Sequence, residues 1–184
     1  TALISVLAGA ELASLGNHFP RAAGIVRIMP NLACALGKSP NALVEVGLDA
    51  AQREEIGILA KALGSAEWLA DETQFDLVTA LAGSGPAFVY RFIDALAAAG
   101  AQLGLDRAQA DRLAVAMVEG ASCLAAASTH SPGDLANLVA SPGGMTRKGL
   151  DVLDHDHALE EILEQCLRAT RDRGAEMAKA ARDQ

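Results

Sequence analysis

The chain has 184 residues, of which 51% are hydrophobic and only 3% aromatic, so its core has to be built from Ala, Leu, Val and Ile. Its formal net charge is −8 and its Lys and Arg residues form no cluster, which argues against nucleic-acid binding. The first residues show no charged-then-apolar signal-peptide pattern, and the sequence contains no apolar run of the roughly 20 residues that span a bilayer. Its three scattered cysteines suggest neither a disulfide framework nor a zinc site. We therefore expect a cytoplasmic protein.

Residues 1–70 alternate short β-like runs with helical stretches. Strands are expected over residues 3–7, 24–29, 42–46 and 65–69, and helices over residues 9–16 and 50–63. Pro30 ends the second strand, and Asp49 caps the longer helix. The alternation predicts an open α/β sheet, yet no Gly-x-Gly-x-x-Gly turn follows any strand. We interpret residues 1–70 as the C-terminal half of a dinucleotide-binding, Rossmann-like domain.

The chain opens at Thr1 directly within an apolar run, without an initiator Met. A chain that starts inside a buried strand is expected to be a fragment. The front of the nucleotide-binding domain would then precede Thr1.

Residues 71–184 are predicted to be entirely helical. Asp71 can cap a first helix, Pro86 suits the first turn of a long apolar one, and Asp106 with Gln109 has the pattern of a capping box. Helices are expected over residues 72 onward, 86–103, 107–128, 132–140, 146–153 and 157–181. The fold class is thus α/β followed by all-α.

The two long helices are apolar around most of their circumference, most clearly over residues 95–101. Such helices are normally surrounded by packing partners, and a domain of this size has too few other elements to supply them. We expect a second subunit to cover these faces. The alternative is that a segment preceding Thr1 covers them.

Three loops have the composition of ligand-binding sites. The loop over residues 141–146, Ser-Pro-Gly-Gly-Met-Thr, combines two glycines with a helix start, so free N–H groups can attract a carboxylate or a phosphate. Residues 82–87 form a second glycine loop before a helix, and residues 27–31 end a strand of the sheet with Asn31. The alternative for each loop is a simple turn or a helix cap. His155 and His157 are interpreted as part of a solvated turn, because residues i and i+2 do not share a helix face.

Together these stretches resemble the pyrroline-5-carboxylate reductase family over essentially the whole chain. The order Arg-x-Met-Pro-Asn, then Gly-Ser-Gly-Pro-Ala, then Ser-Pro-Gly-Gly-x-Thr is the order in that family. The resemblance implies reduction of 1-pyrroline-5-carboxylate to L-proline by hydride from NADPH or NADH. It also implies a helical domain that forms an interlocked homodimer or a higher oligomer, with active sites built between the nucleotide domain and the helices of the dimer. The family layout would place about 80 to 90 residues before Thr1, and we expect the 184 residues alone to be inactive.

The resemblance also assigns roles to residues. Thr146 and Ser84 are the expected catalytic residues, and Thr146 would orient the ring nitrogen. The substrate, held by its carboxylate, is expected to contact Val139, Ser141, Gly143, Gly144, Met145 and Thr146. The cofactor is expected to contact Pro30, Asn31 and Gly83, while its main binding turn lies outside the chain.

Several positions depart from the family pattern toward apolar groups. They are Leu32 and Ala33 after Asn31, Ala116 and Met117 in a long helix, and Met145 in the loop. These departures leave open a reductase of the same architecture that acts on another cyclic imine or imino acid. A third alternative is a non-catalytic dimerisation module.

Overall fold

The computed structural model describes residues 1–182, which form two compact units. Unit 1 comprises Thr1–Pro86 together with the residues from Gln165 onward, and unit 2 comprises Ala87–Glu164. The domain boundary that we place near residue 71 stays a prediction. Within the described residues, no helix combines the length and the apolar character needed to cross a membrane.

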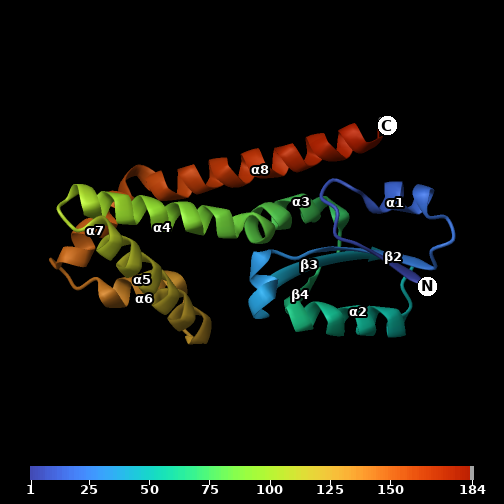
Figure 1. The fold of residues 1–184 in the computed structure, drawn as a ribbon, viewed down its shortest axis with the longest axis horizontal. Coiled ribbons are helices and arrows are strands. Elements are labelled where there is room, and N and C mark those ends of the chain that lie inside the picture. The colour runs from blue at the N-terminus through green and yellow to red at the C-terminus, as the bar shows by residue number, and fades with distance from the viewer. Residues whose placement is uncertain (183–184) are drawn as a thin grey trace. The chain divides into compact units, whose positions relative to one another are not determined.

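Unit 1 contains a four-stranded sheet in the order β1-β2-β3-β4 (Figure 1). Strands β1 and β2 pair in parallel, as do β3 and β4, whereas β2 and β3 are antiparallel. The strands are β1 (Ala2–Ser5), β2 (Gly24–Met29), β3 (Ser39–Val46) and β4 (Gly64–Trp68). The expected partial Rossmann-like sheet is confirmed, and its mixed pairing is a feature that the sequence did not predict.

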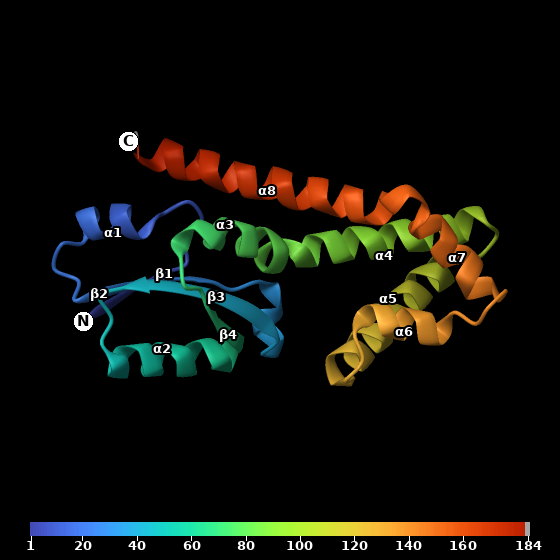
Figure 2. The same cartoon turned by 180° about the vertical axis from the view of Figure 1, so that it is seen from behind.

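Short helical segments connect and follow these strands. They are α1 (Leu12–His18), η1 (Leu32–Leu36), α2 (Ala50–Leu63), η2 (Glu72–Gln74), α3 (Phe75–Val78) and the π-helical turn η3 (Thr79–Gly83). Helices α1 and α3 cover one face of the sheet and α2 covers the other, as Figures 1 and 2 both show. Strand β2 is buried on both faces, with Ile25 in the α1 and α3 core and Val26 in the α2 core, which explains why its residues other than Arg27 are apolar or glycine.

The predicted helix starts are mostly confirmed. Asp49 and Gln52 form a reciprocal capping box at α2. The Thr73 backbone N–H and hydroxyl donate to the Asp71 carboxylate and hold its pKa below its ordinary value. Asp106 accepts the Gln109 N–H, but the return bond of a capping box is not formed.

One predicted helix is wrong in its position. Helix α1 begins at Leu12 rather than near Gly9, which has a φ of +78°. The Leu12 N–H donates to Oε1 of Glu72 at 2.8 Å, so a side chain far along the sequence caps this helix. The sequence around residues 9–16 could not predict this start, because Glu72 lies 60 positions further along the chain.

Unit 2 consists of helices packed through small side chains. They are most of α4 (Gly85–Gln102), then α5 (Arg107–Ala127), α6 (Pro132–Val139), α7 (Met145–Leu153), η4 (His155–His157) and the start of α8 (Ala158–Arg182). Its buried cluster holds only Ala97, Ala110 and Ala114, with Ile93 packed against it. Arg107 bridges Asp111 and Asp94, and these carboxylates raise its pKa.

The C-terminal part of α8 belongs to unit 1 and packs against its loops. A Cβ at Gly174 would lie 3.1 Å from Cγ of Asp76, so the helix approaches α3 closely. Arg182 pairs with Glu11 at 2.7 Å. The two ends of unit 1 are therefore joined by direct contacts.

Replacing Gly64 by Ala should strongly destabilise unit 1. Gly64 has a φ of +150°, and a Cβ there would overlap the backbone of the buried Ser39 in β3. We expect a loss of about 1–3 kcal/mol in the free energy of unfolding, measured by thermal denaturation. Gly16→Ala is the matched control, since its Cβ would lie 3.7 Å from Ile25 and we expect no loss or a gain of up to about 1 kcal/mol. Equal losses in the two variants would contradict this account.

Candidate functional site

The end of strand β2 is fixed by the amide of Asn31. Its backbone N–H donates to Oγ of Ser39 at 2.9 Å, and its Oδ1 accepts the Ala33 N–H at 2.8 Å. Its Nδ2 donates to the carbonyl of Ala82 at 2.8 Å. Both polar atoms of the side-chain amide are therefore hydrogen-bonded, and their partners are backbone groups of the chain. One Nδ2 hydrogen remains for another partner.

The π-helical turn η3 brings Gly83 and the following Ser84 to the end of β2, where Asn31 lies. The Ser84 N–H donates to the Thr79 carbonyl at 2.9 Å, and a Cβ at Gly83 would lie 3.3 Å from Cγ of Met29. Glycine is therefore favoured at position 83 by close packing against the end of β2. Turns of this kind often occur at functional sites. Pro30, Asn31, Gly83 and Ser84 are together called the Asn31 cluster below.

The loop over residues 141–146 forms a tight turn followed by a helix start. The Gly144 N–H donates to the Ser141 carbonyl at 3.0 Å, and Gly143 has a φ of +72°. Proline at the second position and glycine with positive φ at the third are typical of a type II turn. Gly144 is the N-cap of α7 and carries no capping side chain. We call residues 141–146 the Gly143 loop.

The first N–H groups of α7 are available for a ligand. The first helical bond runs from the Lys148 N–H to the Gly144 carbonyl, so the N–H groups of Met145, Thr146 and Arg147 have no partner in the helix. Thr146 is exposed in this first turn. Because Gly144 occupies the cap position, the alternative in which Thr146 is merely the helix cap does not fit the structure.

Two cationic residues, Arg147 and Lys148, lie in the first turn of this helix. Arg147 Nη2 donates to Oδ1 of Asn137 at 2.8 Å and so ties α7 to α6. Lys148 is exposed and lies 3.8 Å from Asp151. Positive charge and free N–H groups both favour an anion at this end of α7.

The structure thus places the expected site residues in two groups. The Asn31 cluster belongs to unit 1, and the Gly143 loop, with the exposed Val139 just before it, belongs to unit 2. The apolar departures from the family pattern are largely solvent-exposed, with exposed fractions of 76% at Leu32, 47% at Met117 and 94% at Met145. None of the three is needed to fill a core.

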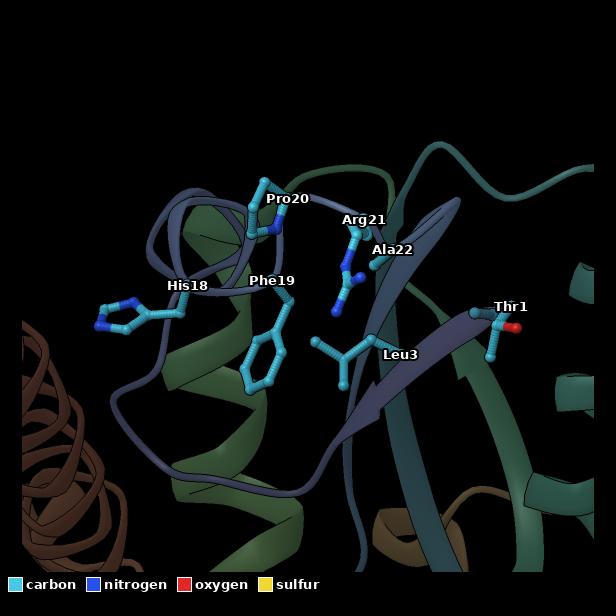
Figure 3. A pocket seen from close by; sticks show the side chains of 8 residues that line it. Thr1, Leu3, His18, Phe19, Pro20, Arg21 and Ala22 are labelled. Atoms are coloured by element: carbon cyan, nitrogen blue, oxygen red, sulfur yellow. The ribbon is translucent and has the colours of Figure 1, made fainter.

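A hollow of about 440 Å³ lies elsewhere, beside the edge strand β1. Figure 3 shows the side chains of Leu3, Phe19 and Arg21 directed toward one another, with His18 pointing away from them. None of the expected site residues lines it. It is therefore not the candidate site.

Unit 2 carries an apolar groove of about 350 Å³ between α4 and α5, called the α4–α5 groove. Several of its side chains are exposed, including Leu103 at 90% and Leu113 at 54%. It is lined by Leu96, Ala97, Ala99, Gly100, Leu103, Leu105, Ala110, Leu113, Ala114 and Met117. Such a continuous apolar surface is typical of an interaction site.

Comparison with known proteins decides the family. Residues 72–177, more than half of the chain, match the family model described as pyrroline-5-carboxylate reductase dimerisation. The chain belongs to the pyrroline-5-carboxylate reductase family. It is 37% identical to pyrroline-5-carboxylate reductase 2 of Bacillus subtilis over 95% of the chain, and 37% identical to the Pseudomonas aeruginosa reductase over 96% of it. The chain spans 63% and 65% of the lengths of these two relatives.

Solved structures agree with this membership. A pyrroline-5-carboxylate reductase from Coxiella burnetii superposes with a TM-score of 0.90 at 30% identity, covering 96% of the chain and 66% of that protein. The Plasmodium falciparum pyrroline carboxylate reductase with NADP bound superposes with a TM-score of 0.83 at 25% identity, covering 97% of the chain and 71% of that protein. The expected family and fold class are therefore confirmed.

Sequence reasoning missed two side chains of unit 1 with buried polar atoms. Thr79 Oγ1 is buried and has no hydrogen-bond partner among the described residues, and the Thr79 side chain lies next to Gly83. Arg27 is buried within the otherwise apolar strand β2. A charged residue in a buried strand was the available signal for Arg27, since such a group needs a partner. No local pattern marks the Thr79 hydroxyl.

Replacing Gly143 by Ala should strain the Gly143 loop. A φ of +72° costs an L-residue about 1–2 kcal/mol, so we expect a lower melting temperature and faster amide exchange at residues 144–147. Gly149→Ala, inside the same helix with nothing within 4 Å of the new Cβ, should instead stabilise the chain by up to about 1 kcal/mol. Unchanged exchange at residues 144–147 in Gly143→Ala would show that the turn does not depend on this glycine.

Proposed function

We propose that the complete protein reduces 1-pyrroline-5-carboxylate to L-proline in proline biosynthesis. The observation that carries this proposal is the Gly143 loop, which presents three unpaired N–H groups at a helix start in a chain of this family. The substrate combines a carboxylate with a ring C=N bond. An anion site with a hydroxyl beside it matches both groups.

Different groups of the Gly143 loop would bind the carboxylate and the ring nitrogen of the substrate. The N–H groups of Met145 and Thr146 bind the carboxylate, and the positive end of the α7 dipole stabilises its charge. The Thr146 hydroxyl accepts a hydrogen bond from the protonated ring nitrogen and so keeps the C=N carbon electrophilic. Correct orientation of a bound substrate can supply up to roughly 7–11 kcal/mol in ideal cases.

A nicotinamide cofactor supplies the hydride when it is bound. The Asn31 cluster suits its nicotinamide end, because the free Nδ2 hydrogen of Asn31 and the hydroxyl of Ser84 complement a carboxamide. Pro30 and Gly83 complete this surface. No Gly-x-Gly-x-x-Gly turn for a pyrophosphate occurs in the sequence, so the 184 residues alone should bind the cofactor weakly. Both NADPH and NADH fit this proposal, and the NADP bound to the Plasmodium falciparum relative supports a nicotinamide nucleotide.

We also propose that two copies of the chain associate through the α4–α5 groove. Unit 2 buries only three small residues in its own cluster and leaves large aliphatic side chains exposed in the groove. The dimerisation family model covers both groove helices. A second copy would remove these side chains from water at about 25 cal/mol per Å² of apolar surface.

An assay of the complete gene product tests the activity. Oxidation of NADPH or NADH should depend on pyrroline-5-carboxylate and yield an equal amount of proline. A six-membered cyclic imino acid should react more slowly. Faster reaction with that analogue would point to the alternative substrate class, and the exposed Met145 is the first residue to replace in that case. If neither compound is turned over, the result would favour the alternative of a non-catalytic dimerisation module.

Replacing Thr146 by Val should lower catalysis without lowering stability. The loss of one hydrogen bond contributes about 0.5–1.5 kcal/mol, or up to roughly 3 with a charged partner, so kcat/KM should fall roughly 3- to 150-fold. Thr170→Val is the matched control, because the Thr170 hydroxyl bonds only the Cys166 carbonyl within α8. A Thr146→Val variant with unchanged kinetics would remove Thr146 from the site.

Light scattering at micromolar concentration should give twice the mass of one chain. Leu113→Lys places a charge in the α4–α5 groove and should shift the chain toward the monomer, since an unpaired charge is costly to bury. Ala62→Lys, at an exposed position of α2, adds the same charge and should leave the dimer intact. A stable wild-type monomer would contradict the proposed assembly.

A further inference from the structure

Arg27 is the one charged residue among the buried polar residues of the described chain. Only 3% of its side chain is exposed, and its Nη1 donates to Oε1 of Glu72 at 2.6 Å. Its guanidinium carbon lies 4.0 Å from the centre of the Phe75 ring, and the Phe75 side chain is fully buried. These contacts join strand β2 to the segment η2–α3.

Glu72 serves a second element at the same time. The oxygen that accepts the Arg27 bond also accepts the Leu12 N–H at 2.8 Å. One carboxylate therefore caps α1 and neutralises the buried arginine. A buried charge depends strongly on such partners, because losing one leaves the other charge uncompensated.

Arg27 and Asn31 contact opposite ends of the segment over residues 72–84. Residues 72 and 75 precede the π turn, whereas the Asn31 amide bonds Ala82 within it. Strand β2 is thus attached to the helical segment at two points, once through Arg27 and once through Asn31. Two attachments fix both the position and the direction of that segment.

We infer that Arg27, held by Glu72 and Phe75, is a positioning residue for the Asn31 cluster. It sets the distance between the end of β2 and the π turn, so that Asn31, Gly83 and Ser84 keep one arrangement. Arg27 has no role in the chemistry itself. Its effect on catalysis rests on the proposed function, while its effect on the π turn does not.

Unit 1 contains a matched control on the other face of its sheet. Arg53 pairs with Glu45 at 2.9 Å, and its guanidinium carbon lies 4.1 Å from the centre of the Trp68 ring. The chemical groups match those around Arg27, but 44% of the Arg53 side chain is exposed. Solvent weakens such a pair, and no part of the Asn31 cluster contacts it.

The test compares Arg27→Met, Arg27→Lys, Glu72→Gln and Arg53→Met in the complete gene product. For Arg27→Met we expect faster amide hydrogen exchange at residues 79–84 and a KM for the nicotinamide cofactor raised about 10- to 100-fold, with a smaller change in kcat. Arg27→Lys keeps the charge and should recover part of both effects. Glu72→Gln should change both readouts in the same direction but less, and Arg53→Met should change neither.

A lower melting temperature with unchanged exchange at residues 79–84 and an unchanged KM would overturn the inference, because Arg27 would then be merely structural. If Arg27→Met does not fold, Glu72→Gln decides by the same two readouts. If the wild-type protein does not reduce pyrroline-5-carboxylate, the proposed function fails. The exchange at residues 79–84 still decides the positioning role in that case.

Discussion

The arrangement of unit 1 depends on the hydrogen bonds of Asn31 at the point where β2 ends. Pro30 has no N–H to continue the strand, so the Asn31 side chain takes over and holds the following 3₁₀ turn on one side and the π turn on the other. Its backbone N–H in turn needs the hydroxyl of Ser39, which is fully buried. Ser39 leaves room only for a glycine at position 64. A single line of tight contacts therefore places the polar groups at this end of the sheet.

Unit 2 follows a different physical rule. Its helices approach closely because their contacts are made by alanine and glycine, as where a Cβ at Gly100 of α4 would lie 3.7 Å from Cβ of Ala110 in α5. Small side chains bury little apolar surface, and the larger aliphatic ones remain exposed in the α4–α5 groove. A unit built in this way gains stability from association.

Features with local causes could be predicted from the sequence. Strand β2 and helix α2 lie where Pro30 and the Asp49–Gln52 box place them, and the Gly143 loop has the turn that its Pro-Gly pair demands. Features with distant partners could not. The start of α1 and the burial of Arg27 both depend on Glu72, which lies 60 and 45 positions further along the chain.

Asn31 has both a feature with a local cause and a feature with a distant partner. The place of Asn31 at the end of β2 follows from Pro30, whereas the carbonyl of Ala82 that its amide binds is 51 positions away and was not foreseeable. The family resemblance supplied the roles that no pattern of residues could give. What the geometry adds is a physical reason for each role: unpaired N–H groups for an anion, and a polar strand end for an amide.

Binding of a proline-like ligand's carboxylate at the start of α7 is the step on which the proposed function rests. Titration of L-proline into the complete gene product, followed by two-dimensional amide NMR, tests it most directly. We predict saturable shifts of the Met145, Thr146 and Arg147 amide resonances, and we expect these shifts to be lost in Gly144→Val because a side chain there would meet the Ser141 hydroxyl. Saturable proline binding that leaves these three resonances unmoved would contradict it.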